Sequence, residues 1–304
     1  MSNREHIDGA AMQQRNHIHA RGYRPPAQSV DPSFRIIKDL ADDLSKGKVS
    51  FPTFINATVK IHRALNDPQA DADRVARTIS GEPLLAAKLV HVANSVGLGA
   101  PGKPVADVKG AILRVGYSNV QAIAATVAMS QLVVAKEMQP FLKRAEAVWG
   151  HSLDVAAIAF VLARKLTRLN PDEALFAGLV HDIGRFYLLS KVSKYPELAA
   201  DLVALEAVLD EWHAPIGQAV LGTFGLTDAV LDAVAEHEST HYSNAPKTLS
   251  EVIIVANVRS KCPNPLNRHD SGFRPANEAD LSEMLGVLES SAEELTSLVA
   301  ALRA

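Results

Sequence analysis

The sequence predicts an all-α fold, built as a multi-helix bundle of two helical lobes. Hydrophobic residues make up 47% of the 304 residues while aromatic residues make up only 5%. The apolar content therefore depends on Ala, Leu and Val, which favours closely packed helices over β-sandwiches. Apolar residues also recur at three- and four-residue spacing along most of the chain, which is the period of an amphipathic helix.

The helices of the first lobe are each bounded by a capping residue or a helix breaker. They are predicted from Asp31 to the region of Gly47, from Pro52 to near Pro68, through Val75 and Ile79, from Pro83 to Asn94, from Val105 to Gly116, and from Ser118 to Glu137. A second group of helices begins beyond Pro140, and the last 28 residues are predicted to form two more. The Gly- and Pro-rich stretch that follows Ser95 is predicted to be a loop.

These elements divide the chain into four predicted parts. Residues 1–30 are polar and form a flexible arm, because they lack the apolar content for a core. Residues 31–140 form the N-terminal helical lobe, and residues 141–260 form the second helical lobe. Residues 261–304 form a loop followed by the C-terminal helices.

Composition excludes several classes of function. The formal net charge is -3, which disfavours nucleic acid and anionic membrane surfaces as partners. Cys262 is the single cysteine, so the chain has neither an intramolecular disulfide nor a cysteine-based zinc cluster. We expect a cytoplasmic protein, because we find neither an apolar leader nor about 20 uninterrupted apolar residues.

The sharpest local signal lies in residues 170–185, NPDEALFAGLVHDIGR. Asn170 and Glu173 are predicted to form a capping box at the start of a short helix, and Gly184 to end it in a left-handed conformation. This helix would carry His181 and Asp182 in its final turn. A neighbouring imidazole and carboxylate are a plausible pair of metal ligands. An isolated His-Asp pair is, however, more often a packed and hydrogen-bonded helix terminus.

Other polar residues occupy the apolar faces of their predicted helices. His151, His237 and Asn257 follow the apolar period of their neighbours, which indicates that they face inward. His213 precedes Pro215, which suits a first helical turn, so we expect His213 at the entrance of a helix. Each residue alone is more often a satisfied core residue than a ligand. Five residues of compatible chemistry nevertheless indicate one shared site, namely His151, His181, Asp182, His213 and His237.

The chain resembles the HDOD domain family, a branch of the HD and HD-GYP metal-dependent phosphohydrolase superfamily. The resemblance rests on a helix with a histidine followed about thirty residues later by GLVHDIGR, and on segments of the first lobe. These segments are ISGEP (residues 79–83), LVHVANS (residues 89–95) and VADVKGAILRVG (residues 105–116). It covers residues 35–260 and implies that the second lobe is HD-domain-like.

The resemblance also implies a set of site residues. The metal ligands would be His151, His181 and Asp182, with His213 and His237 available to a second ion. One or two divalent ions (Fe, Mn or Mg) are implied, or none. The last aspartate of the pattern falls on Asn257, which removes one negative charge and weakens the attraction for a hard ion. Arg185 stands where related hydrolases carry a basic residue, and would bind phosphate or stabilise a helix terminus.

Two functions follow from this ligand set. The first is a bacterial signalling protein that acts as a non-catalytic scaffold or ligand-sensing module with a degenerate metal site. Its expected partners are signalling proteins, with a nucleotide as an alternative ligand. The second is a metal-dependent phosphohydrolase or cyclic-dinucleotide phosphodiesterase in which Asp182 is catalytic. The missing acid at Asn257 favours the scaffold.

Overall fold

A computed structural model describes residues 31–49, 61, 64–65, 71–95, 103–240, 243–262 and 278–303. Every regular element in these ranges is a helix, which confirms the predicted all-α fold. The predicted arm of residues 1–30 lies outside the described residues. The predicted helix that follows Pro52 also lies outside them, apart from residues 61, 64 and 65.

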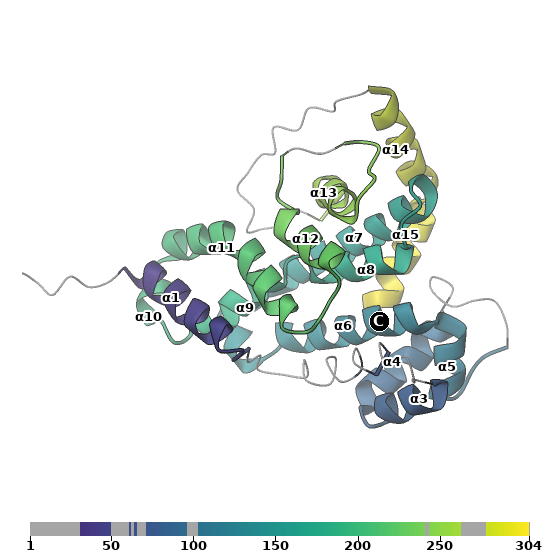
Figure 1. Ribbon diagram of the computed structural model, residues 1–304, viewed down its shortest axis with the longest axis horizontal. Helices are drawn as coiled ribbons and strands as arrows, with labels where there is room; N and C mark the ends of the chain where they lie inside the picture. Colours follow the sequence, from purple (N-terminus) through teal and green to yellow (C-terminus); the bar gives the residue numbers. More distant parts are fainter. Residues whose placement is uncertain are drawn as a thin grey trace, which may run out of the picture.

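Figure 1 shows how the described helices are arranged. In chain order they are α1 (Pro32–Ser45), α3 (Ala72–Ser80), α4 (Pro83–Ala93), α5 (Val108–Val115), α6 (Tyr117–Val133), the 3-10 helix η1 (Lys136–Phe141), α7 (Leu142–Leu166), α8 (Pro171–Val180), α9 (Ile183–Val192), α10 (Pro196–Ala200), α11 (Leu202–Gly222), α12 (Asp228–Glu236), α13 (Leu249–Arg259), α14 (Glu278–Ser290) and α15 (Ala292–Arg303).

The helices pack around two hydrophobic clusters, and α6 contributes to both. Ile123 and Val127 of α6 belong to the smaller cluster, together with residues of α3, α4 and α5. Met129 and Leu132 of α6 belong to the larger cluster, together with residues of α1 and of every helix from α7 to α15. Figure 1 shows the group of α3, α4 and α5 beside one end of α6, apart from the remaining helices. The two lobes are therefore joined through the two faces of α6.

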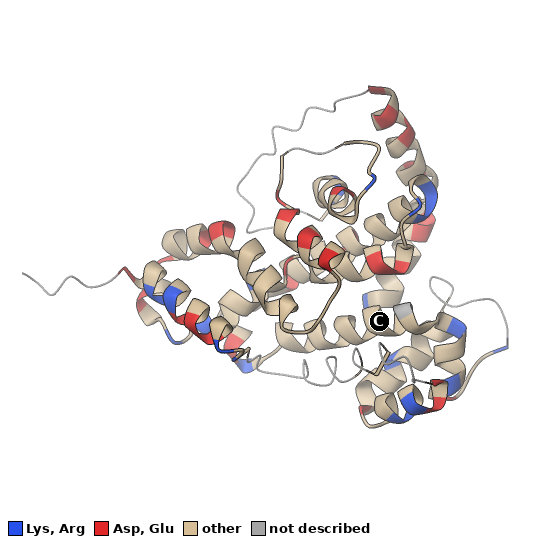
Figure 2. Ribbon diagram, in the orientation of Figure 1, with Lys and Arg blue, Asp and Glu red and all other residues tan. Residues whose placement is uncertain are grey.

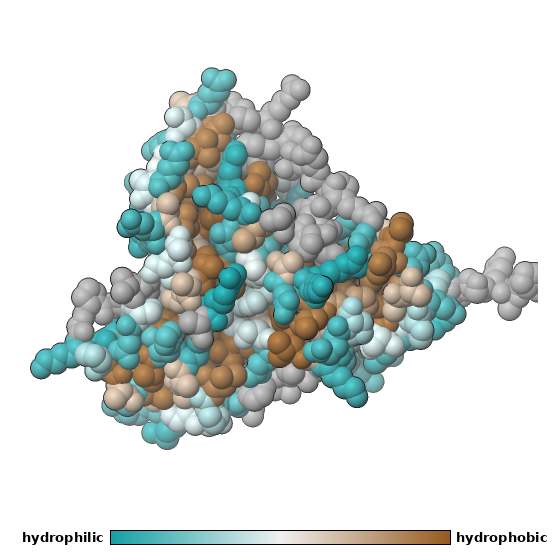
Figure 3. Space-filling view, turned by 180° about the vertical axis from the view of Figure 1, so that it is seen from behind, coloured by the Kyte–Doolittle hydropathy of each residue, from teal (hydrophilic) through white to brown (hydrophobic). Residues whose placement is uncertain are grey.

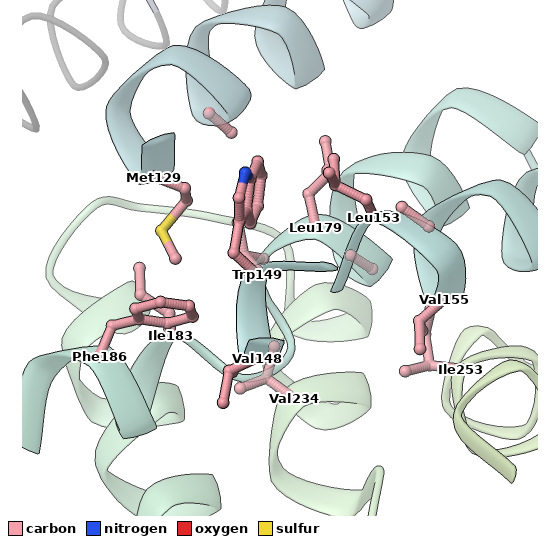
Figure 4. Packing of buried hydrophobic residues seen from close by; sticks show 14 of the residues in the cluster. Met129, Val148, Trp149, Leu153, Val155, Leu179, Ile183, Phe186, Val234 and Ile253 are labelled. Carbon is pink, nitrogen blue, oxygen red and sulfur yellow. The ribbon is translucent and has the colours of Figure 1, made fainter. Parts of the chain in front are cut away.

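Helix α7 runs through the larger cluster and supplies much of its apolar surface. Figure 4 shows side chains of this helix and of its neighbours, with Val148, Trp149, Leu153 and Val155 from α7, Met129 from α6, Leu179 from α8, Ile183 and Phe186 from α9, Val234 from α12 and Ile253 from α13. The stretch Lys136–Leu166 is long and apolar enough to span a membrane by length and composition alone. Within this protein, however, 72% of its most apolar window is buried against other helices, as in the core helix of a globular protein.

Charged and apolar side chains are unevenly distributed over the surface. Figure 2 shows charges of both signs along α1 and on the outer turns of α3 and α5, while the ribbon of α6 carries none. The face seen in Figure 3 carries apolar patches that hydrophilic residues interrupt. Among the large apolar side chains that remain exposed are Phe34, Leu113 and Val203.

The long helix predicted from Ser118 to Glu137 is shorter in the structure. Helix α6 ends at Val133, and the chain continues as the 3-10 helix η1. Pro140 lies inside η1 and has no N–H to donate, which is incompatible with an uninterrupted α-helix. The tighter 3-10 turn carries the chain from α6 into α7.

Candidate metal centre

The predicted site residues come from five helical segments of the larger lobe. His151 lies on α7, His213 on α11 and His237 at the C-terminal end of α12. His181 and Asp182 form the junction between α8 and α9. The five side chains are at most 2% exposed, so the structure places all of them in the interior. Asn257 on α13 is half-buried and faces the same region.

The start of α8 is partly as predicted. The side chain of Asn170 accepts a hydrogen bond from the N–H of Asp172 at 2.9 Å, so Asn170 is the N-cap. Glu173 does not complete a capping box with it. Its Oε1 instead accepts a hydrogen bond from the hydroxyl of Thr227, 3.0 Å away at the start of α12. The tertiary contact therefore replaces the local one.

The predicted end of this helix at Gly184 is wrong. Helix α8 ends at Val180, and Gly184 lies inside α9 without a positive φ. A Cβ atom at Gly184 would lie 1.9 Å from the carbonyl oxygen of His213 and 2.8 Å from the amide nitrogen of Gly217. Glycine is needed here because the backbones of α9 and α11 approach closely. That approach brings Asp182 and His213 together.

The predicted position of His213 at a helix entrance is also wrong. Helix α11 continues from Leu202 to Gly222 with Pro215 inside it, so His213 lies within the helix. The ring Nδ1 of His213 lies 2.7 Å from the carbonyl oxygen of Leu209, one turn earlier. This contact holds the ring against its own helix and directs Nε2 away from it.

All four histidines share one hydrogen-bond pattern. In each ring Nδ1 lies 2.7 to 2.8 Å from a backbone carbonyl oxygen, with the pairs being His151 with Cys262, His181 with Gly178, His213 with Leu209, and His237 with Val234. A carbonyl can only accept, so Nδ1 carries a proton, and in the neutral ring Nε2 carries the lone pair. A hydrogen bond from Nδ1 to a carbonyl oxygen is typical of histidines that ligate a metal through Nε2.

The four Nε2 atoms point toward a common volume around Asp182. His213 Nε2 and His237 Nε2 lie 3.0 Å apart, and both lie within 3.7 Å of Asp182 Oδ1. His181 Nε2 lies 3.5 Å from Asp182 Oδ2 and, although buried, has no hydrogen-bond partner. Buried lone pairs that face one another are unfavourable without a proton or a cation between them.

His151 and Asn257 show the same conflict. Asn257 Nδ2 donates to the carbonyl oxygen of His237 at 3.2 Å, which leaves its Oδ1 facing His151 Nε2 at 2.8 Å. Rotating the amide would satisfy His151 but would bring two carbonyl oxygens together. In either orientation, the amide of Asn257 leaves two acceptor atoms facing each other with no hydrogen between them. The predicted replacement of an acid by Asn257 therefore affects the hydrogen bonding of the site.

Arg185 is only 1% exposed and binds carboxylates. Its Nε donates to Asp182 at 2.8 Å, Nη1 to Asp210 at 3.1 Å and Nη2 to Glu238 at 3.1 Å. A buried guanidinium in this arrangement is an ion-pair hub. Contact between Arg185 and a phosphate stays a prediction, and it would require the guanidinium to leave these acids.

The electrostatics hold most of the donor groups in the form that binds a cation. Burial lowers the pKa of His181 to about 3, and burial together with the Arg185 guanidinium lowers the pKa of His213. Burial alone would lower the pKa of His237, but the Asp182 and Glu238 carboxylates outweigh it and raise this pKa. Burial would also raise the pKa of Asp182, but Arg185 holds it well below its usual range. Neutral imidazoles and an ionised carboxylate are the forms that bind metal, so His181, His213 and Asp182 are held in their binding forms, whereas His237 must release a proton when a cation binds.

Sequence reasoning does not single out Asp210 or Glu238. Glu238 follows His237 directly, and its Oε1 lies 3.4 Å from His213 Nε2 and 3.6 Å from His237 Nε2. Burial opposes ionisation of Glu238, but the neighbouring His213 and His237 lower its pKa to about 2. Adjacency to a predicted ligand was the one sequence signal for Glu238. Its contact with the site depends on how α12 ends.

The described residues can therefore hold a metal ion. Two groups of donor atoms come together, and both include Asp182: one with His151 and His181, the other with His213, His237 and Glu238. The partnerless Nε2 of His181 fits a cation in the first group, and the facing Nε2 atoms of His213 and His237 fit one in the second. Imidazole nitrogens with carboxylates suit first-row transition metals.

Two curated proteins are similar to this chain, each over less than half of its own length. An uncharacterized protein from Treponema pallidum (strain Nichols) is 23% identical over 240 residues, which is 73% of this chain and 43% of that protein. Ribonuclease Y from Fervidobacterium nodosum is 31% identical over 109 residues, which is 36% of this chain and 17% of that protein. The chain thus spans less than half the length of these curated relatives.

Solved structures share the fold over most of the chain. A protein from Shewanella amazonensis SB2B, provisionally named a metal-dependent phosphohydrolase, has a TM-score of 0.68 at 23% identity and covers 90% of this chain and 100% of its own. An HDOD domain protein of unknown function from Geobacter sulfurreducens has a TM-score of 0.56 at 23% identity and covers 90% and 99%.

These structural likenesses, at their low identity, concern the fold alone. The family model of the HDOD domain, however, matches residues 51–240 of the sequence itself. This match covers more than half of the chain, including His151, His181, Asp182, His213 and His237. The chain belongs to the HDOD domain family.

Proposed function

We propose that this chain is a bacterial signalling protein that acts as a non-catalytic scaffold or ligand-sensing module. A divalent cation at the buried cluster would join α7, the α8–α9 junction, α11 and α12, and the helical surface would engage a signalling partner. The observation that supports this proposal best is the burial of the cluster. His181 and Asp182 are 0% exposed, and His213 and His237 are 1% exposed.

Burial favours a structural role over hydrolysis. A phosphohydrolase needs water and a phosphate ester at its metal, with an open coordination position facing a cleft. Here the four histidines and Asp182 are enclosed by helices, and three guanidinium nitrogens of Arg185 are engaged by acids. Asn257 adds no charge where a carboxylate would help to bind a second ion.

The donor set also favours particular metals. Four imidazoles and few carboxylates suit iron or manganese better than magnesium, which prefers oxygen ligands in octahedral geometry. When bound, the ion would supply charge neutralisation and cross-linking of helices. His151, His181 and Asp182 form one group of donors that would hold an ion, and His213 and His237 belong with Asp182 to the other.

One observation favours the alternative function, a metal-dependent phosphohydrolase or cyclic-dinucleotide phosphodiesterase. The two groups of donor atoms share Asp182, whose two oxygens face different histidines. A carboxylate in this position is able to bridge two ions, as two-metal hydrolysis requires. In that case Asp182 would be essential for turnover.

Elemental analysis and turnover assays on the full chain distinguish the two functions. We expect the gently purified protein to contain a transition metal, and its turnover of bis(p-nitrophenyl) phosphate and cyclic dinucleotides to equal that of Asp182→Ala. The exposed Asp232 on α12 provides the matched control, Asp232→Ala, which should keep the metal. Two equivalents of metal with turnover that only Asp182→Ala abolishes would overturn the scaffold proposal.

A further inference from the structure

We infer that Glu238 is the fourth ligand of a four-coordinate cation site formed with Asp182, His213 and His237. This inference rests on the proposed cation site and names the residue that completes it. Neither the sequence motif nor the family resemblance points to Glu238. The group with Glu238 has four donor atoms, whereas the group around His151 and His181 has three.

The distances among the four donor atoms match those around a single ion. Atoms bound at about 2.1 Å to one tetrahedral ion lie about 3.4 Å from one another. Here the two Nε2 atoms of His213 and His237 lie 3.0 Å apart. Glu238 Oε1 lies 3.4 and 3.6 Å from them, and Asp182 Oδ1 lies 3.7 and 3.6 Å from them. Five of the six edges of a tetrahedron are thus close to their expected length.

The lone pairs of the two histidines are already directed to this point. His213 Nδ1 donates to Leu209 and His237 Nδ1 donates to Val234, so in the neutral rings both Nε2 atoms are acceptors. Two acceptors 3.0 Å apart in the interior need a proton or a cation between them. Close by, the buried Nε2 of His181 has no hydrogen-bond partner and faces Asp182. This second observation also indicates that the cluster binds a cation.

Arg185 orients the two carboxylates that would bind the ion. Its Nε donates to Asp182 Oδ1 at 2.8 Å, and its Nη2 donates to Glu238 Oε1 at 3.1 Å, so one rigid guanidinium holds both ligand oxygens. Its Nη1 pairs with Asp210. The charges balance, because Asp210 compensates Arg185 and the remaining two carboxylates compensate one divalent ion.

Asn257 contacts the segment that carries Glu238. Asn257 donates from Nδ2 to the carbonyl oxygen of His237, which fixes the end of α12 just before Glu238. The amide thus positions the segment that carries the new carboxylate. The negative charge that Asn257 lacks is supplied from the other side of His237.

The test is a titration of the metal-free full chain with Co²⁺. Calorimetry measures the affinity, and visible absorption reports whether the bound ion is four-coordinate. We expect Glu238→Gln to weaken Co²⁺ binding at least about tenfold and to change the absorption bands. Glu238→His keeps a donor and should retain Co²⁺ binding with the intense absorption of a four-coordinate site. Glu236→Gln, on the exposed side of the same segment, is the matched control and should behave as the unchanged protein.

Different results would overturn different claims. If Glu238→Gln binds Co²⁺ with unchanged affinity and unchanged bands, Glu238 is not a ligand, while the proposed cation site stands. If the unchanged protein binds no Co²⁺, the cation site itself is refuted. Circular dichroism of each metal-free variant shows whether its helices remain folded, and the His variant separates loss of a ligand from loss of structure.

Discussion

Arg185 is a buried guanidinium that pairs with carboxylates from three segments of the chain. Asp182 precedes α9, Asp210 lies on α11 and Glu238 follows α12. Burial opposes its charge, but Asp182 and Glu238 outweigh burial and raise the pKa of Arg185. Such a hub is costly to break, because removing one partner leaves the others buried without compensation.

We predict that Arg185→Met destabilises the protein by about 3–5 kcal/mol at neutral pH. The loss should shrink as the pH falls toward 5, because protonation of the orphaned carboxylates removes their buried charge. Urea denaturation at several pH values measures this. Arg164, which is 42% exposed and pairs with Glu294, provides the control Arg164→Met with an expected change below about 1 kcal/mol. Equal losses in the two variants would contradict a hub role for Arg185.

The crossing of α9 and α11 determines how close Asp182 lies to His213. Gly184 allows the two backbones to approach, and Gly217 lies opposite it on α11. The similar contact of Gly178 with the backbone of Ala156 brings α8 against α7. Side chains at these positions would separate helices that carry His151, Asp182 and His213.

We predict that Gly184→Ala costs about 3 kcal/mol or more, at the upper end of overpacking effects, because the new methyl group meets backbone atoms that cannot rotate away. It should also weaken Co²⁺ binding by displacing Asp182 from His213. Thermal unfolding and Co²⁺ titration measure the two effects. Gly286→Ala on α14 is the control, since nothing lies within 4 Å of its added Cβ. If Gly184→Ala leaves the stability and the Co²⁺ affinity unchanged, the close approach of α9 and α11 is not needed for either.

On the scale of the whole molecule, the site connects helices that are far apart in the chain. The larger cluster extends from α1 to α15, and the C-terminal helix closes it with Leu298 and Leu302. The Lys88 side chain of α4 donates to the carbonyl oxygen of Leu302, which links the smaller lobe to the chain terminus. A cation held by three helical segments would add to the stability of this lobe as a unit.

We predict that chelation of the metal lowers the melting temperature. A ligand present at 100 times its Kd stabilises the folded state by about 2.7 kcal/mol, which corresponds to a shift of roughly 5–10 °C for a domain of this size. Calorimetry with and without EDTA measures the shift. Asp182→Ala should lose the dependence on metal, while Asp232→Ala should keep it. A melting temperature that is independent of metal in the unchanged protein would refute a stabilising ion.

Much of the local structure was predictable because its signals are local. The cap at Asn170, the turn at Gly116 and the apolar period of the helices follow from residues within a few positions of one another. The same period also placed His151 and His237 on inward faces. For these reasons the sequence by itself determined the helical class and most of the donor atoms.

The tertiary structure decided everything that depends on contacts between distant residues. Gly184 lies at the crossing of two helices and does not cap one. Pro215 lies inside α11 and does not begin it, and Glu173 binds Thr227 and does not complete a capping box. Periodicity shows which face of a helix is buried but not which helix lies against it. Only the packed backbone therefore brought Glu238 to the histidines and directed Arg185 to carboxylates.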